Sequence, residues 1–291
     1  MQEGVVVRSL SGFFDVATGE EVRRCKARGV FRKRGTTVLV GDRVTIEPVG
    51  MTEGTIFEVL PRQTELVRPP VANVDQAVLV LSAVDPAFMP HLLDRLLVSV
   101  LRARLSPVIV ITKVDLADSD ALTAITRVYK AADFAVFPVV GKVGQGVETV
   151  RTRLRGHVSV FVGPSGVGKS TLANALAPEL GVKMGEISEK AGRGKHTTRH
   201  VELFELEPDT YIVDAPGFSS LELDVPSTEL RNYFPEFQPL AAACPYRGCQ
   251  HVDEDECAVR VAAQTGALAE SRYESYRSLW HELRDREEHR Y

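Results

Sequence analysis

Hydrophobic and polar positions divide the chain into three stretches with different periods. Up to about residue 68, short runs of alternating apolar and polar residues are interrupted by glycines, and no helical period is visible. This pattern is typical of a small β-barrel. The strands that it predicts are 4–8, 12–16, 21–27, 37–40, 42–48 and 54–60.

Beyond residue 69, long apolar runs alternate with stretches of helical period. The apolar runs are nearly continuous, as expected of strands covered on both faces, and they span 76–82, 107–112, 135–140 and 157–162. The helices predicted between and after them are 89–104, 119–132, 147–155 and 171–177. Such alternation predicts a mostly parallel, doubly wound α/β sheet. A predicted hairpin of 200–206 and 210–214 adds one antiparallel strand.

The last stretch is predicted to be mostly helical and to end in a long helix over 267–288. Tyr273, Tyr276, Leu279, Trp280 and Leu283 recur in it at three- and four-residue spacing, which suits packing onto a neighbouring element. We therefore expect three domains with different architectures. They are a barrel at 1–68, an α/β domain at 69–225 and a helical domain at 226–291.

Composition limits where the protein works. Of the 291 residues, 44% are hydrophobic and 25% charged, and no apolar run approaches the roughly 18 residues of a membrane span. The first residues also lack the basic-then-apolar pattern of a signal peptide. These features predict a cytoplasmic protein with no membrane partner.

Local charge matters more than the net charge of −4, which does not itself indicate a nucleic-acid partner. Between residues 23 and 34 of the barrel stretch there are seven basic residues and no acidic one, namely Arg23, Arg24, Lys26, Arg28, Arg32, Lys33 and Arg34. A solvated loop face and a contact with an RNA phosphate backbone are both compatible with this run. The barrel and the accompanying Phe31 favour RNA.

Residues 163–171, GPSGVGKST, fit the phosphate-loop pattern G-x-x-x-x-G-K-[ST]. The motif lies between a predicted strand and a predicted helix, which is the context it requires. Its glycines let backbone N–H groups turn toward an anion at the positive end of the helix. Lys169 is then expected to reach the β- and γ-phosphates and Ser170 to bind Mg²⁺. The expected nucleotide-binding residues are Gly163, Ser165, Gly166, Val167, Gly168, Lys169, Ser170 and Thr171.

A second motif, T-K-x-D, ends the predicted strand 107–112. The carboxylate of Asp115 can accept hydrogen bonds from N1–H and the 2-amino group of guanine, whereas adenine lacks this pair of donors. The aliphatic part of Lys113 would lie along the base, and Thr112 completes the motif. An aspartate that only caps the next helix is the alternative. The phosphate loop in the same sheet favours guanine recognition.

A third motif, D-x-x-G, follows the predicted strand 210–214. Asp214 would bind Mg²⁺ and the N–H of Gly217 would sense the γ-phosphate. The glycine-punctuated loop 192–199 precedes it, and Thr197 or Thr198 is expected to give Mg²⁺ a second hydroxyl beside Ser170. The sequence does not decide between these two threonines.

The C-terminal stretch contains four candidate metal ligands, Cys244, Cys249, His251 and Cys257. Three thiolates and one imidazole leave no open position, so they predict one structural, tetrahedral zinc ion. Unrelated buried cysteines are the alternative, which the close spacing disfavours. Cys25 stands apart and is expected in the core of the barrel.

The motifs occur in an unusual order, because the T-K-x-D motif precedes the phosphate loop by about fifty residues. Together with the cysteine cluster, this order makes the chain resemble the RsgA (YjeQ/YloQ) family of circularly permuted GTPases. The resemblance rests also on the stretches 68–69, 72–76, 93–95, 192–200 and 214–218.

The resemblance implies an OB-fold barrel, a permuted GTPase domain and a zinc domain. It also implies an enzyme that hydrolyses GTP to GDP and phosphate with Mg²⁺, stimulated by the small (30S) ribosomal subunit during late maturation. We expect a monomer, although the sequence itself does not determine the oligomeric state. Its partners would be that subunit and its 16S rRNA, without DNA. A nucleotide-sensing RNA-binding protein with incidental hydrolysis is the alternative function, and Asp115 disfavours an ATP-dependent enzyme.

The sequence departs from the usual pattern of such enzymes in four places. Thr112 replaces an asparagine, which predicts weaker supporting hydrogen bonds, and 140–142 replace a Ser-Ala-Lys-like turn. Phe218 stands where many GTPases have a water-orienting glutamine, so we expect His196 to position the water, with Lys169 as the other catalytic residue. Gly166 replaces the asparagine of potassium-dependent relatives, so potassium activation is not expected.

Overall fold

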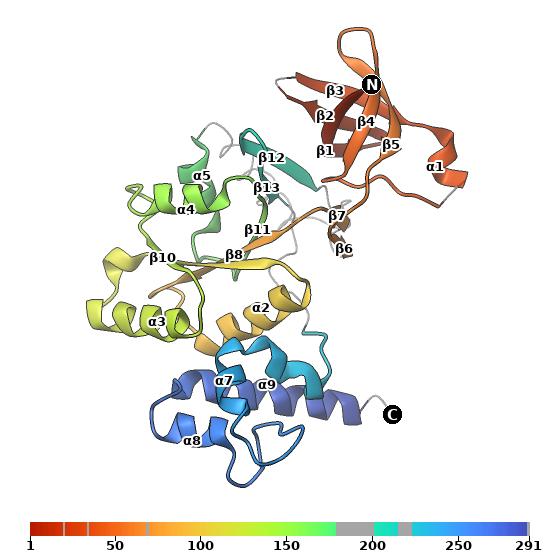
Figure 1. The fold of residues 1–291 in the computed structure, drawn as a ribbon. Helices are drawn as coiled ribbons and strands as arrows, with labels where there is room; N and C mark the ends of the chain where they lie inside the picture. Colours follow the sequence, from red (N-terminus) through yellow and green to blue (C-terminus); the bar gives the residue numbers. More distant parts are fainter. Residues whose placement is uncertain (20, 34, 68–69, 179–200, 215–222, 290–291) are drawn as a thin grey trace. The chain divides into compact units, whose positions relative to one another are not determined.

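The structure is a computed structural model that describes the chain except for residues 20, 34, 68–69, 179–200, 215–222 and 290–291 (Figure 1). The chain forms two compact units and passes between them several times. The first unit comprises Met1–Val78, Gly141–Val162 and Lys169–Ser220. The second comprises Leu79–Val140, Gly163–Gly168 and Leu221–Tyr291.

The N-terminal part of the first unit is a closed barrel of five strands, which confirms the predicted architecture. Its strands are β1 (Gln2–Leu10), β2 (Phe13–Thr18), β3 (Glu21–Ala27), β4 (Arg43–Val49) and β5 (Glu53–Val59). They pair in the order β1, β2, β3, β5, β4, and β4 pairs again with β1; only β3 and β5 run parallel. Cys25 has no exposed surface and belongs to the barrel core, as expected.

One expected strand of the barrel is wrong. Segment 37–40 forms no strand, and only Val40 makes an isolated bridge, to Val71. The reason is that side chains satisfy its backbone instead of a partner strand: Asp42 accepts from Leu39 N, and Arg62 donates to Thr37 O. A short helix, α1 (Gly29–Lys33), also lies in a stretch where no helix was expected.

A parallel pair with a hairpin completes the sheet of the first unit. Strand β13 (Thr210–Asp214) runs parallel to β11 (Val158–Val162) and antiparallel to β12 (Glu202–Glu207). The predicted hairpin is thereby confirmed, with its first strand shifted by one to two residues. Strand β12 also pairs with barrel strand β1, at Glu202 and Arg8. Helices α4 (Val147–Leu154) and α5 (Lys169–Leu176) belong to this unit, as does the small hairpin of β6 (Glu65–Val67) and β7 (Pro70–Ala72).

The second unit contains the other parallel strands and two amphipathic helices. Strand β8 (Gln76–Ser82) continues into it from the first unit, and β9 (Ser106–Thr112) runs parallel to β10 (Val136–Val139). Helix α2 (Pro90–Arg102) begins with proline at its first turn, and α3 (Ser119–Ala131) is capped by the Asp118 carboxylate. These elements confirm the expected α/β pattern.

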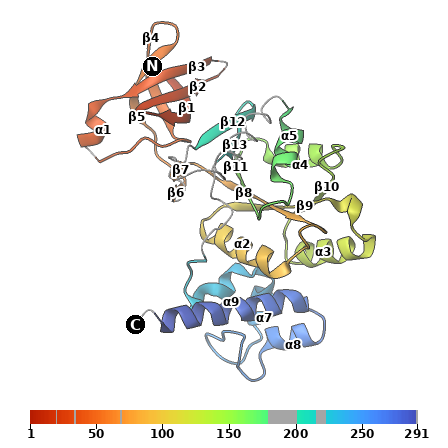
Figure 2. The same cartoon turned by 180° about the vertical axis from the view of Figure 1, so that it is seen from behind.

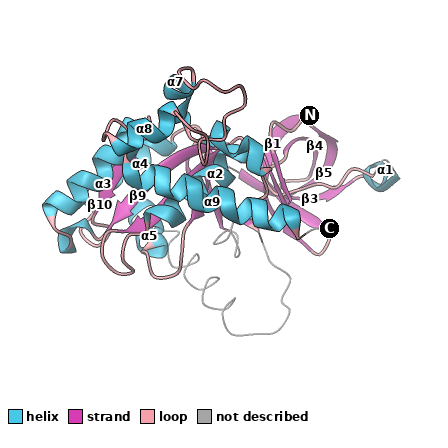
Figure 3. Ribbon diagram, turned by 90° about the horizontal axis from the view of Figure 1, so that it is seen from below, coloured by secondary structure: helices cyan, strands magenta, loops and turns pink. Residues whose placement is uncertain are grey.

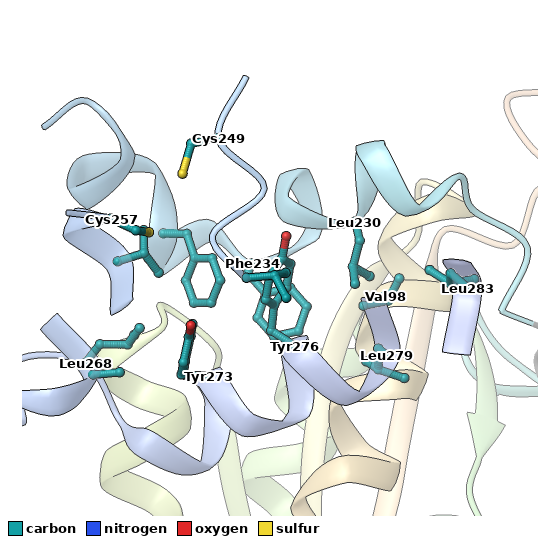
Figure 4. Packing of buried hydrophobic residues seen from close by; sticks show 14 of the residues in the cluster. Val98, Leu230, Phe234, Cys249, Cys257, Leu268, Tyr273, Tyr276, Leu279 and Leu283 are labelled. Carbon is teal, nitrogen blue, oxygen red and sulfur yellow. The ribbon is translucent and has the colours of Figure 1, made fainter. Parts of the chain in front are cut away.

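The C-terminal part of the second unit is helical. It contains the 3₁₀ helices η2 (Ser227–Tyr233) and η3 (Pro235–Phe237), followed by α7 (Gln238–Ala241), α8 (Ala258–Gln264) and α9 (Glu270–Glu288). Figure 2 shows α9 lying along α2, and Figure 3 shows α7, α8 and α9 as helices. Its core contains Phe234, Tyr276 and Leu279 together with Val98 of α2 (Figure 4). In the described ranges, no helix has the length and apolar character that crossing a membrane requires.

Candidate functional site

The phosphate loop has the strand, loop and helix context that its sequence predicts. It joins the end of β11 to the start of α5, and Gly163, Gly166 and Gly168 all have positive φ angles. A Cβ on Gly163 would lie 2.1 Å from the carbonyl oxygen of Val80, so the residue must be glycine. The loop therefore has the backbone that an anion-binding turn requires, and Ser165, Ser170 and Thr171 are exposed beside it.

Lys169 is the first residue of α5, and its ammonium group is half-buried. Burial lowers the pKa of Lys169 below its usual value, because a partly desolvated cation is disfavoured. An anionic phosphate beside the ammonium would reverse this shift. The location and charge of this residue therefore suit a phosphate-binding lysine.

Thr112 connects the T-K-x-D motif to the phosphate loop. Its side chain is 4% exposed, and its Oγ1 lies 2.5 Å from the carbonyl oxygen of Val167 and 3.2 Å from that of Leu81. The hydroxyl has one proton, so it donates to one of these acceptors at a time. The side chain of Thr112 thus reaches the phosphate loop directly.

The next residues of the motif form an open turn. Lys113 has a left-handed backbone with φ of 55°, and its Nζ donates to the backbone oxygen of Asp85. Asp115 lies exposed in the 3₁₀ turn η1 (Val114–Leu116). The ring of Pro86 lies 3.9 Å from the position that a Cβ on Gly166 would take. The loop after β8 therefore borders both motifs, which the sequence analysis did not foresee.

The turn after β10 lies against the phosphate-loop helix. A Cβ on Gly141 would stand 3.2 Å from Cγ2 of Thr171, so the close approach favours glycine. This is the turn that is expected, from the sequence, to replace a Ser-Ala-Lys-like turn. Gly141 of this turn therefore packs closely against the first turn of α5.

The D-x-x-G motif is described only at its start. Asp214 ends β13, and the parallel pairing of β13 with β11 brings the ends of both strands to the same edge. The other expected residues of this region lie outside the described residues. They are His196, Thr197, Thr198, Gly217 and Phe218.

The four expected zinc ligands lie together in the second unit. The ligand atoms of Cys244, Cys249, His251 and Cys257 are all within 4.8 Å of one another, and three of these residues are buried. Figure 4 shows the thiols of Cys249 and Cys257 beside the aromatic core. Burial lowers the pKa of His251, which favours the neutral imidazole that binds metals. Three thiols and an imidazole at this spacing fit a structural zinc ion.

Long side chains hold the backbone of the ligand loop. Arg231 donates to the carbonyl oxygen of Cys249, and Tyr273 donates to that of His251, at 2.7 and 3.0 Å. The carboxylate of Glu254 accepts from Gln250 N and Val252 N, on either side of His251. The ligands are therefore positioned by the fold around them.

A buried ion cluster in the second unit was missed at the level of sequence. Arg272 of α9 contacts Asp94 of α2 and lies 2.6 Å from Glu236, and the hydroxyl of Tyr129 of α3 donates to Asp94. Arg272 is 1% exposed and Asp94 has no exposed surface. Burial opposes the charge of Arg272, but the two carboxylates outweigh burial and raise its pKa. This cluster ties α9 to the two helices that flank the T-K-x-D motif.

Comparisons with known proteins agree with this arrangement. Residues 59–224 match the sequence model of the RsgA GTPase family, and residues 3–56 match that of the RsgA N-terminal domain. The chain is 48% identical to the small ribosomal subunit biogenesis GTPase RsgA of Geobacillus kaustophilus, over 98% of this chain and 99% of the relative. Two crystal structures are also similar along almost their full lengths.

The first is YjeQ from Thermotoga maritima, with 37% identity and a TM-score of 0.83 over 97% of this chain and 98% of that protein. The second is YloQ, described as a circularly permuted GTPase, with 38% identity and a TM-score of 0.83 over 98% of this chain and 96% of that protein. Both likenesses include the barrel, the permuted order and the C-terminal region. The chain therefore belongs to the RsgA family of circularly permuted GTPases.

Proposed function

We propose that this protein binds the small (30S) ribosomal subunit, hydrolyses GTP there during late maturation and is released on hydrolysis. The contact of Thr112 with Val167 carries this proposal, because it brings a guanine-type motif and a phosphate loop into one structure despite their reversed order. The relatives are named as GTPases of small ribosomal subunit biogenesis, which supports the partner. The protein acts in the cytoplasm as a monomer that contacts 16S rRNA and no DNA.

The nucleotide is held by both motifs. Asp115 accepts from the guanine edge, Lys113 lies along the base, and Thr112 supports the turn. Backbone N–H groups of 163–171 and the ammonium of Lys169 hold the phosphates. Ser170, Asp214 and one of Thr197 and Thr198 would hold Mg²⁺, which would neutralise charge on the phosphates. Gly217 contacts the γ-phosphate, and zinc holds the C-terminal part together.

The three domains, with boundaries after residues 68 and 225, have separate roles. The barrel binds RNA, the central domain binds and hydrolyses the nucleotide, and the zinc domain makes a second contact with the subunit. Because the D-x-x-G motif leads directly into the C-terminal part, a change at the γ-phosphate is passed to that part. Hydrolysis thereby loosens the protein from the subunit.

The deciding experiment measures GTP hydrolysis by the full chain with and without purified small subunits. We expect a large stimulation, since groups supplied by a partner raise such rates by about 10³ to 10⁵. A stimulation below about threefold would instead identify a nucleotide-sensing RNA-binding protein. ATP in place of GTP serves as the control, and equal binding of both nucleotides would contradict the role of Asp115.

His196 is proposed to position the attacking water, because Phe218 cannot form a hydrogen bond with it. His196→Ala should lower the subunit-stimulated rate by about 10²-fold or more without changing GDP affinity. His289→Ala, which alters an exposed histidine near the C-terminus, is the control. Full stimulated turnover of His196→Ala would remove this residue from the mechanism.

A further inference from the structure

The outer face of the barrel has two exposed aromatic rings, each covered by a cation. Nζ of Lys26 lies 5.0 Å from the centre of the Phe13 ring, and Cζ of Arg28 lies 4.5 Å from the centre of the Phe57 ring. Phe13 is 38% exposed and Phe57 is 41% exposed, although large apolar side chains are normally buried. The four residues are called the aromatic–cation strip below.

The pairing of the strands places the strip on one continuous face. Phe13 of β2 is directly opposite Lys26 of β3. Strand β5 runs beside β3 with Ile56 opposite Ala27, which places Phe57 next to Arg28. Side chains alternate along a strand, and the intervening Cys25 and Ile56 point into the barrel core, so Lys26, Arg28 and Phe57 point outward.

The charges of the strip are available to a ligand. In the described part of the chain, neither Lys26 nor Arg28 has a carboxylate within ion-pair distance, whereas Arg23 and Arg24 are paired with Glu21 and Asp15. Within the described part of the basic run, Arg23 and Arg24 are therefore neutralised, whereas Lys26 and Arg28 keep their charge available. The rings of Phe13 and Phe57 lie against Lys26 and Arg28.

We propose that the aromatic–cation strip binds unpaired bases of single-stranded RNA, an inference that rests on the RNA-binding role proposed above for the barrel. A base stacks on an aromatic ring or on the flat guanidinium of Arg28, and the cations contact the adjoining phosphates. Neighbouring strands lie about 4.8 Å apart and Phe13 and Phe57 are on strands two apart, so the rings take two different bases. A duplex has no free base faces and would use only the cations.

The test measures binding of the full chain to a fluorescent single-stranded oligouridine and to an RNA duplex of the same length. The double substitution Phe13→Leu and Phe57→Leu keeps apolar side chains but removes the π-faces. We expect the affinity for the single strand to fall about tenfold or more, with the salt dependence unchanged and duplex binding unaffected. Lys26→Gln should instead make the salt dependence shallower by about 0.7 in log–log slope.

Val49→Ala is the matched control, since it removes an exposed apolar side chain from strand β4 of the same barrel. Single-strand affinity that survives the double substitution, or an equal loss for the duplex or for Val49→Ala, would overturn the inference. The inference would also be overturned if the strip bound ribosomal protein and no RNA. If small subunits still stimulate hydrolysis by the double variant and its RNA affinity is unchanged, the proposed function stands and this inference fails. If the double variant loses single-strand binding but small subunits do not stimulate the unsubstituted protein, this inference stands and the proposed function fails.

Discussion

The hydroxyl of Thr112 is a single group on which the alignment of two motifs depends. It is buried, and its acceptor on Val167 belongs to the phosphate loop, 55 residues away along the chain. A buried carbonyl that loses its donor pays a desolvation cost of about 1–3 kcal/mol. At the scale of one residue, nucleotide binding should therefore respond to the loss of this hydroxyl.

Thr112→Val removes the hydroxyl and keeps the shape of the side chain. We expect the dissociation constant for GDP to rise about tenfold, because 1.4 kcal/mol corresponds to one factor of ten. Thr112→Ser retains the donor and should bind nearly as well as the original protein. Fluorescent GDP titration checks both, and wild-type affinity of Thr112→Val would show that this bond does not support the site.

The helices of the second unit are held together by the buried cluster around Arg272. The guanidinium lies 4.5 Å from the centre of the Phe234 ring and contacts carboxylates from α2 and η3. Removing one partner from a buried ion cluster is costly, since the remaining charges stay desolvated. This contact therefore stabilises the docking of α9 more than its exposed ion pairs do.

Arg272→Met should lower the free energy of unfolding by about 3–5 kcal/mol, because Asp94 and Glu236 lose their counter-ion. Urea denaturation monitored at Trp280 measures the change. Arg284→Met is the control on the same helix, since its partner Glu288 is exposed and such pairs contribute little. Similar effects of both substitutions would contradict the special role of the cluster.

The ligand loop between α7 and α8 provides a second prediction at this scale. The full chain should contain one zinc ion, and Cys257→Ser should lose it and unfold at a lower temperature. Cys25→Ser keeps the zinc, because Cys25 lies in the barrel core. Metal analysis by mass spectrometry, together with thermal denaturation, distinguishes the two variants. Unchanged zinc in Cys257→Ser would remove this residue from the site.

For the molecule as a whole, local sequence patterns predicted the elements better than the contacts between them. The apolar runs and the phosphate loop carry their own signals, so β8, β9, β11 and α5 were found within a few residues. The segment 37–40 was wrongly predicted to be a strand. Its backbone is hydrogen-bonded by side chains that include Arg62, about twenty-five positions away. The contact of Arg272 with Asp94 spans 178 residues and has no local signature. The cysteine spacing did identify the candidate zinc site, since all four ligands lie close in sequence.

Strand β1 belongs to the barrel and also borders β12, through the pair of Arg8 and Glu202. A truncated chain that starts after the barrel would leave this side of β12 without its neighbour, and an uncovered strand edge readily recruits another chain. Aggregation of such a fragment would then be mistaken for a loss of catalytic competence. Assigning activities to separate parts of this protein is therefore better done by point substitutions than by cutting the polypeptide.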